Sequence, residues 1–301
     1  MINFIASDKD LRAVEKGINY VWSPKLDFIF NDKEKIKNIV VMSFDSKGFF
    51  IWKHKQNNIS LFSQKQQTSS LPDYDLFIVP HNLIIEEKYQ LGWGTGFLLQ
   101  EKISQEKIFN FPKENVVNFQ IISGSFLTQF INSQKAKTKT CPLNPYTTYE
   151  SYLATIVHEF GHAYYNNFHT WWYSDKTENL DYLNQALDLY QSKKIKNIAE
   201  INFPNYDKRE TLLSELFAFC TDYTAASIFW ESHKKDIDAS NSEEIDQLLK
   251  TEEIKNLYKE NSVLDPIPSA HTAALVFGKI LTTHHPRSWP QKILCANKLT
   301  L

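Results

Sequence analysis

The sequence predicts a mixed α+β protein, with a sheet-bearing N-terminal lobe over residues 1–145 and a mainly helical C-terminal lobe over residues 146–301. Runs of β-branched and aromatic residues separated by turn residues dominate up to residue 122. After Pro145, apolar residues recur at three- and four-residue steps instead. A length of 301 residues also exceeds what one hydrophobic core usually spans, which favours two lobes.

In the N-terminal lobe, apolar residues at helical steps predict a short helix over residues 8–20. Later runs rich in Val, Ile, Phe and Trp predict strands, because such residues suit a pleated, half-buried surface. Turn residues such as Gly48 and Asn57 lie between or beside these runs. The expected strands are 39–44, 48–52, 59–62, 76–79 and 116–122.

In the C-terminal lobe, helical periodicity predicts a succession of helices with almost no strand signal. The first of them follows Pro145, and Thr147 with Glu150 fits the pattern of a capping box at its start. A polar connection over residues 135–140 is expected to precede this lobe. The expected helices are 147–166, 178–194, 207–232, 241–260 and 269–283.

The composition argues against several classes of partner. Lys and Arg total 33 against 35 for Asp and Glu, and no basic block stands out, so no nucleic-acid partner is expected. No apolar run approaches the roughly eighteen residues of a membrane helix, and no signal peptide is seen at the N-terminus. Three widely spaced cysteines do not indicate a disulfide framework, so a reduced cytoplasmic setting is the expectation. Nothing indicates an oligomeric state.

The most informative segment is His158-Glu159-Phe160-Gly161-His162, which has the pattern H-E-x-x-H. Residues four apart lie on one face of an α-helix, so the two imidazoles can bind one metal ion. A Glu beside the first His can accept a proton from water at that ion. The pattern therefore predicts two zinc ligands, His158 and His162, and a general base, Glu159. The alternative is one histidine in the core and one on the surface.

A catalytic zinc site needs a third protein ligand. The metzincin pattern would place Gly at position 165 and His at position 168, where this chain has Tyr165 and Phe168. Glu215 is a better candidate, because it interrupts an apolar helical run from Leu212 to Cys220. A buried carboxylate is costly unless a metal or a cation compensates it.

Other interpretations of this helix stay open. Glu215 could instead form a salt bridge with Lys208 or Arg209. Glu210 is a further candidate ligand in a more polar setting. Asp222, two turns after Glu215, could accept a hydrogen bond from a ligand histidine and orient it.

Together, His158 to His162 and the segment Glu215 to Ala218 resemble the gluzincins, zinc peptidases that combine H-E-x-x-H with a downstream glutamate. The E-x-x-A form is similar to that of compact members. The resemblance implies a zincin-like fold with an active-site cleft between the lobes. It also implies one zinc ion per chain and a peptide or protein substrate. Thermolysin-type members carry Asp four residues after the ligand Glu, where this chain has Phe219.

The implied reaction is hydrolysis of a peptide bond, in which Glu159 takes a proton from water and returns it to the leaving amine. The developing oxyanion needs a donor besides zinc, and the candidates are His271 and Tyr223. A helix-capping His and a core Tyr are the plainer interpretations. Two other classes also remain: a zinc-containing regulatory or binding protein that is not proteolytic, and a helical scaffold with a chance motif.

Overall fold

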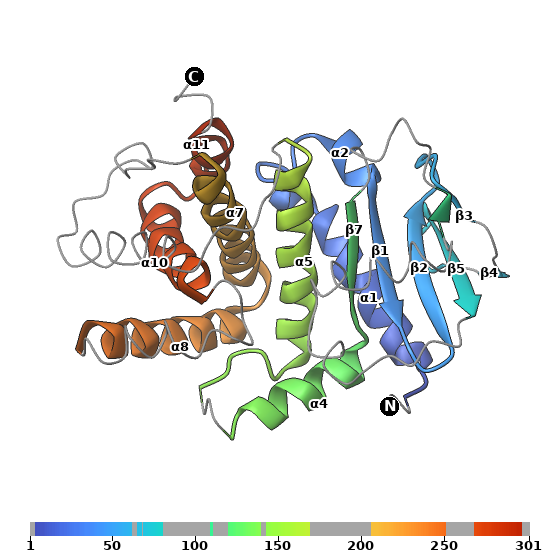
Figure 1. Ribbon diagram of the computed structural model, residues 1–301, viewed down its shortest axis with the longest axis horizontal. Coiled ribbons are helices and arrows are strands. Elements are labelled where there is room, and N and C mark those ends of the chain that lie inside the picture. Colours follow the sequence, from blue (N-terminus) through green and yellow to red (C-terminus); the bar gives the residue numbers. More distant parts are fainter. Residues whose placement is uncertain are drawn as a thin grey trace. The chain divides into compact units, whose positions relative to one another are not determined.

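The computed structural model describes residues 4–61, 65–67, 69–80, 109–110, 120–139, 143–168, 206–250 and 268–296. The chain forms two compact units, Met1–Asn167 and Phe168–Leu301 (Figure 1). The first unit contains every strand described, and the elements described in the second are all helices. The expected α+β class, with a helical C-terminal part, is therefore confirmed.

The first unit is built on a mixed five-stranded sheet. Neighbouring strands are antiparallel except for the pair formed by β1 and β7, which run parallel. All six residues of β1 are buried, since this strand lies inside the sheet and under helices. In spatial order the strands are β4 (Lys65–Gln67), β5 (Tyr74–Pro80), β2 (Gly48–His54), β1 (Ile39–Phe44) and β7 (Gln120–Ser125).

A separate two-stranded sheet pairs β3 (Ser60–Leu61) with β6 (Phe109–Asn110). The expected strands near residues 39, 48, 59 and 76 are all present, with ends that differ by a few residues. The last expected strand begins at Gln120 as β7, and residues 116–119 of the expectation lie outside the described part of the chain.

In the part of the first unit that the structure describes, the α-helices beside the sheet are α1 (Asp8–Val21), α2 (Lys33–Lys37), α4 (Leu127–Lys137) and α5 (Tyr149–Asn166), with a short 3-10 turn at Pro24–Leu26. Helix α4 covers residues 135–137, the first half of the polar connection expected over residues 135–140. Its start is joined to that of α1, because Asp10 accepts hydrogen bonds from Ser7 and from the backbone and hydroxyl of Thr128. Burial opposes ionisation of Asp10, but these hydrogen bonds hold its pKa below the ordinary value.

Helix α5 belongs to the first unit, although the expected lobe boundary at residue 145 had assigned it to the helical lobe. It packs against α1, α2 and α4 and against strands β1 and β7 (Figure 1). Apolar side chains cover much of its circumference, and sequence periodicity does not reveal which neighbour they contact. The boundary of the unit therefore follows α5 rather than preceding it.

The second unit is organised around helix α7 (Tyr206–Phe229), which packs against α8 (Glu231–Lys250), α10 (Pro268–His284) and α11 (Trp289–Ala296). The expected helix over 207–232 ends at Phe229, and α8 begins at Glu231 rather than near residue 241. The early turns of α8 bury His233, Ile237 and Asn241, a mostly polar stripe that apolar periodicity does not detect. The expected helix 178–194 and residues 251–260 lie outside the described residues.

None of the helices described is long and apolar enough to cross a membrane. Cys220 and Cys295 are free thiols, the first buried and the second exposed. Cys141 lies outside the described residues.

The contact between Gly17 of α1 and Ile156 of α5 leaves no room for a side chain at position 17. A Cβ there would lie 2.5 Å from Ile156 Cδ1 and 3.0 Å from Ile156 Cβ. We expect Gly17→Ala to destabilise the protein by about 1–3 kcal/mol because overpacking outweighs the better helix propensity of Ala. Thermal or urea unfolding measures the change. Adding Ile156→Val, which removes Cδ1, should recover part of the loss, and strictly additive effects would contradict this packing.

A pH prediction concerns His54, which is buried between Trp22 and Tyr74. Its Nδ1 accepts a hydrogen bond from the backbone of Gln56 at 3.1 Å. Burial, and next the nearby charge of Lys37, lower its pKa. The folded protein thus binds fewer protons here than the unfolded chain does. This contribution to stability is present above the ordinary histidine pKa of about 6.5 and is lost as the pH falls from there toward the lowered pKa.

Urea unfolding of wild type and His54→Asn checks the prediction, since Asn keeps an acceptor for Gln56. The wild type should lose more stability than the variant between about pH 7.5 and pH 5. Equal losses in the two proteins would contradict it.

Candidate metal centre

Helix α5 starts at a capping box one residue later than the sequence suggested. Thr148 is the N-cap, and its hydroxyl accepts a hydrogen bond from the backbone N–H of Ser151 at 3.1 Å. The Ser151 hydroxyl in turn accepts from the Thr148 N–H at 3.0 Å. The expected partners, Thr147 and Glu150, do not form the box. Ser151 can take the place of Glu because its short side chain is buried against the first turn.

Buried contacts along α5 hold it in the first unit. The Tyr152 hydroxyl donates to the carbonyl of Ser125 at the end of β7, at 3.2 Å. About three turns further on, the Tyr164 hydroxyl donates to Asn31 Oδ1 at 2.7 Å and accepts from the Asp32 N–H at 3.0 Å. Burial raises the pKa of Tyr164, so its hydroxyl keeps the proton that it donates. These contacts on both sides of residues 158–162 fix the rotation of the helix.

The C-terminal end of α5 is also secured. The Asn167 side chain donates to the carbonyl of Ala163 at 2.8 Å. The Lys35 ammonium donates to the carbonyl of Asn167 at 3.0 Å. A cation at a helix C-terminus satisfies an orphan carbonyl and interacts favourably with the helix dipole. The last turn, which follows His162 directly, is therefore well anchored.

His158, Glu159 and His162 are all half-buried on α5. The imidazole centroids of the two histidines are 4.9 Å apart, with an angle of 74° between the ring planes. This is the outcome of helical spacing, which puts residues four apart on the same face. The two rings are close enough for a nitrogen from each to bind the same ion. Glu159 is the next residue round the helix from His158.

Glu215 lies in the middle of α7 and is only 4% exposed. Its neighbours Leu212, Leu216 and Ala218 are completely buried. Burial of a carboxylate in such surroundings costs several kcal/mol unless an opposite charge or a metal compensates it. The buried carboxylate of Glu215 is therefore a suitable ligand for a cation, which would compensate its negative charge.

The three candidate ligands form one group of side chains. One imidazole nitrogen from each of His158 and His162 and one carboxylate oxygen of Glu215 all lie within 4.8 Å of one another. Two imidazoles and a carboxylate are a ligand set that zinc commonly takes in catalytic sites. The burial of Glu215 fits that set, since a divalent cation compensates a buried carboxylate. The residues predicted from the sequence as metal ligands therefore form the candidate metal centre.

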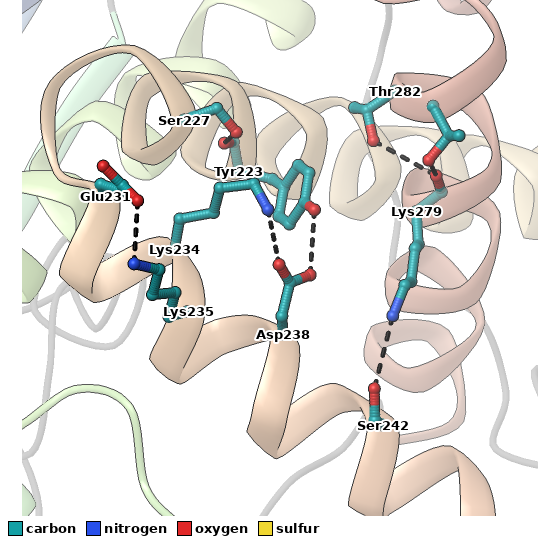
Figure 2. A network of polar contacts seen from close by, with 10 residues as sticks. Tyr223, Ser227, Glu231, Lys234, Lys235, Asp238, Ser242, Lys279 and Thr282 are labelled. Atoms are coloured by element: carbon teal, nitrogen blue, oxygen red, sulfur yellow. Dashed lines mark hydrogen bonds and ion pairs between the residues drawn. The ribbon is translucent and has the colours of Figure 1, made fainter.

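Tyr223, one of the two candidates for stabilising an oxyanion, takes part in a polar network with α8 (Figure 2). Its hydroxyl donates to Asp238 Oδ1 at 2.9 Å, and Lys234 lies over its ring at 5.1 Å from the centroid. Lys234 also forms an ion pair with Asp238 at 2.5 Å. Burial is the main cause that raises the pKa of Tyr223. The hydroxyl thus keeps its proton and directs it to Asp238.

Several other predicted side chains lie outside the described part of the structure. His271 is in the first turn of α10, which begins at Pro268 rather than after a Ser269 cap, and its side chain is not described. The same holds for the side chains of Glu210, Lys208 and Arg209 at the start of α7. Their roles stay predictions.

Asp222 lies close to a histidine that the sequence did not single out. Its Oδ1 is 3.9 Å from Nε2 of His233 on α8, and both side chains are buried. The available signal was the four-residue spacing of His233, Ile237 and Asn241, which marks the buried face of α8. Because two of these three residues are polar, the pattern of apolar residues does not identify the buried face.

Comparison of the chain with protein-family models, with curated proteins and with solved structures gives no match. Functional inference for this protein therefore starts from its own residues and their placement.

Proposed function

We propose that this protein is a zinc-dependent peptidase with His158, His162 and Glu215 as the metal ligands and Glu159 as the general base. The observation that carries the proposal is the grouping of ligand atoms from these three side chains within 4.8 Å. The placement of a second acidic residue next to His158 supports catalysis in particular, because a structural zinc site has no use for a base there. The zincin-like fold is part of this proposal.

Each ligand would contribute a different property. His158 and His162 offer neutral imidazole nitrogens on one face of α5, and Glu215 offers a negative charge. Zinc in a site with three protein ligands polarises a carbonyl oxygen and makes a water molecule more acidic. The buried surroundings of Glu215 strengthen its attraction for the cation, since charges interact more strongly away from bulk water.

Glu159 would carry out the proton transfers. Its carboxylate accepts one proton from the attacking water, whose oxygen forms a bond to the carbonyl carbon of the substrate. It then gives that proton to the leaving nitrogen as the C–N bond breaks, so the water is divided between the two products. The half-buried position of Glu159 suits this role, because the group must face both the site and an incoming substrate.

The developing oxyanion would need a hydrogen-bond donor besides the metal. Tyr223 would have to break its hydrogen bond to Asp238 before it could donate to the oxyanion, and that loss costs energy. His271 remains the other candidate. The substrate class is a peptide or protein, and no feature described here selects a sequence at the cleavage site.

The general base is tested with Glu159→Gln. We expect this variant to retain one zinc ion per chain and to lose about 10²–10⁴-fold in turnover of a mixed peptide library, because Gln cannot accept the proton. Metal analysis and kinetics on the same preparation measure both quantities. Wild-type protein that binds zinc without cleaving any peptide would contradict the peptidase and favour a non-proteolytic binding or regulatory protein. An undiminished rate for the variant would remove Glu159 from the mechanism.

The third ligand is tested with Glu215→Ala against Glu210→Ala as a matched control five residues earlier on α7. We expect Glu215→Ala to weaken zinc binding by at least about 100-fold, as the loss of a charged ligand implies, and Glu210→Ala to leave it unchanged. Titration with a competing chelator measures the affinities. The opposite ranking would reassign the ligand, and a wild type that binds no zinc would refute the metal centre as a whole.

A further inference from the structure

We propose that Asp222 of α7 and His233 of α8 form a buried ion pair, and that its proton makes the attachment of α8 to α7 depend on pH. The two side chains are at most 1% exposed, and Asp222 Oδ1 lies 3.9 Å from His233 Nε2. Opposite charges attract more strongly in the interior than at the surface, whereas burial opposes the charging of each partner, and 3.9 Å is longer than a hydrogen bond. In the proposed pair the attraction is the larger of the two effects, so the charged form of each partner favours the charged form of the other. The pairing needs no metal.

The described contact between α7 and α8 includes several polar and charged groups. Besides the Asp222–His233 pair, Asp238 of α8 accepts from the Tyr223 hydroxyl of α7, and Lys234 lies over the Tyr223 ring (Figure 2). Among the described side chains of α8, Ile237 is the buried apolar residue, and Trp230 is buried just before the helix. A change of charge at these polar contacts should therefore loosen the attachment of α8.

Among the described side chains of α7, α8, α10 and α11, no other buried group is a cation, and the lysines among them are partly or fully exposed. Glu215 and Cys220 are the remaining buried titratable groups among these side chains. Glu215 is acidic, and burial raises the pKa of the Cys220 thiol well above its usual range, so this thiol stays neutral. The others are partly or fully exposed: Tyr223, Glu231, Lys234, Lys235, Asp236, Asp238, Glu243, Lys279, His284, Lys292 and Cys295.

The direction of the pH effect follows from linkage. Where attraction to an anionic partner outweighs the cost of burial, a histidine holds its proton more tightly in the folded state than in the unfolded chain. Its stabilising contribution is complete below the ordinary histidine pKa of about 6.5, and it is lost as the pH rises through the higher folded value. In acid, protonation of Asp222 would remove its negative charge, so the ion pair would be lost at low pH as well. Helix α8 should therefore be held most firmly in weakly acidic to neutral solution.

This pair lies on the helix that carries Glu215. Asp222 is seven residues after Glu215, which places it within about 20° of the same direction on α7. Release of α8 would therefore loosen α7 on the face that bears Glu215. Such a device would let pH act on that helix through a group that touches neither metal nor substrate.

The experiment follows the histidine ring signals of the full-length protein by NMR between about pH 5 and pH 9. The His233 signal is assigned by its loss in His233→Gln. We expect His233 to keep its proton at about pH 7.5, where an ordinary histidine has lost most of it. In Asp222→Asn, which keeps the shape and removes the charge, His233 should lose its proton at least about one pH unit earlier.

Amide hydrogen exchange of α8 provides the second measurement. Corrected for the intrinsic rates, protection of α8 in the wild type should fall at least about tenfold from pH 6.5 to pH 9, and in Asp222→Asn it should not depend on pH over this range. Glu231→Gln is the matched control, because it removes an ion pair with Lys235 on the same helix whose side chains are 79% and 73% exposed. This variant should behave as wild type.

A neutral His233 at pH 7 in the wild type would overturn the ion pair, whatever the variants do. Protonated His233 with pH-independent protection of α8 would overturn the link to helix attachment. If Asp222→Asn fails to fold, the wild-type titration and exchange data still decide both points. Neither measurement involves zinc or peptide cleavage, so its failure is distinguishable from failure of the proposed function.

Discussion

The close contact of α5 with α1 is the constraint on which the first unit depends. Gly17 lets the two helix backbones approach until Ile156 fills the space where a side chain would be. This contact, with the hydrogen bonds of Tyr152 and Tyr164, sets the rotation of α5 about its axis. That rotation keeps Phe160 and Tyr164 in the core and leaves His158 and His162 half-buried. A metal centre needs such a fixed face, because two ligands on a helix are useful only if both point at one ion.

The second unit depends on a similar approach between α7 and α10. A Cβ at Gly278 would lie 2.4 Å from the ring of Phe219, so α10 packs directly on α7 one turn after Glu215. On another side, Trp289 of α11 packs edge-on to Phe217. Apolar groups thus pack on the helix that carries Glu215, whereas the described contacts of α8 with α7 include the Asp222–His233 pair and the Tyr223–Asp238 hydrogen bond.

Much of the fold was predictable because the elements have strong local signals. Strand β1 and helices α1 and α5 match their expected ranges within a few residues, since their apolar periodicity is unambiguous. Helices α4 and α8 were missed or misplaced because their buried faces include Gln129, Gln134, His233 and Asn241. Polar residues buried by tertiary contacts look like surface residues in a sequence. The assignment of α5 to the first unit was missed for a related reason, since periodicity identifies a buried face but not its neighbour.

The sequence by itself determined which residues could bind a metal ion, which could accept a proton, and that two of the candidate ligands share a helical face. These properties follow from residue type and from about 3.6 residues per helical turn, both of which are local. The tertiary structure decided what depends on distant contacts. It buried Glu215, committed the Tyr223 hydroxyl to Asp238 and placed His233 beside Asp222. Burial and pairing arise when separate helices pack, so local spacing alone does not determine them.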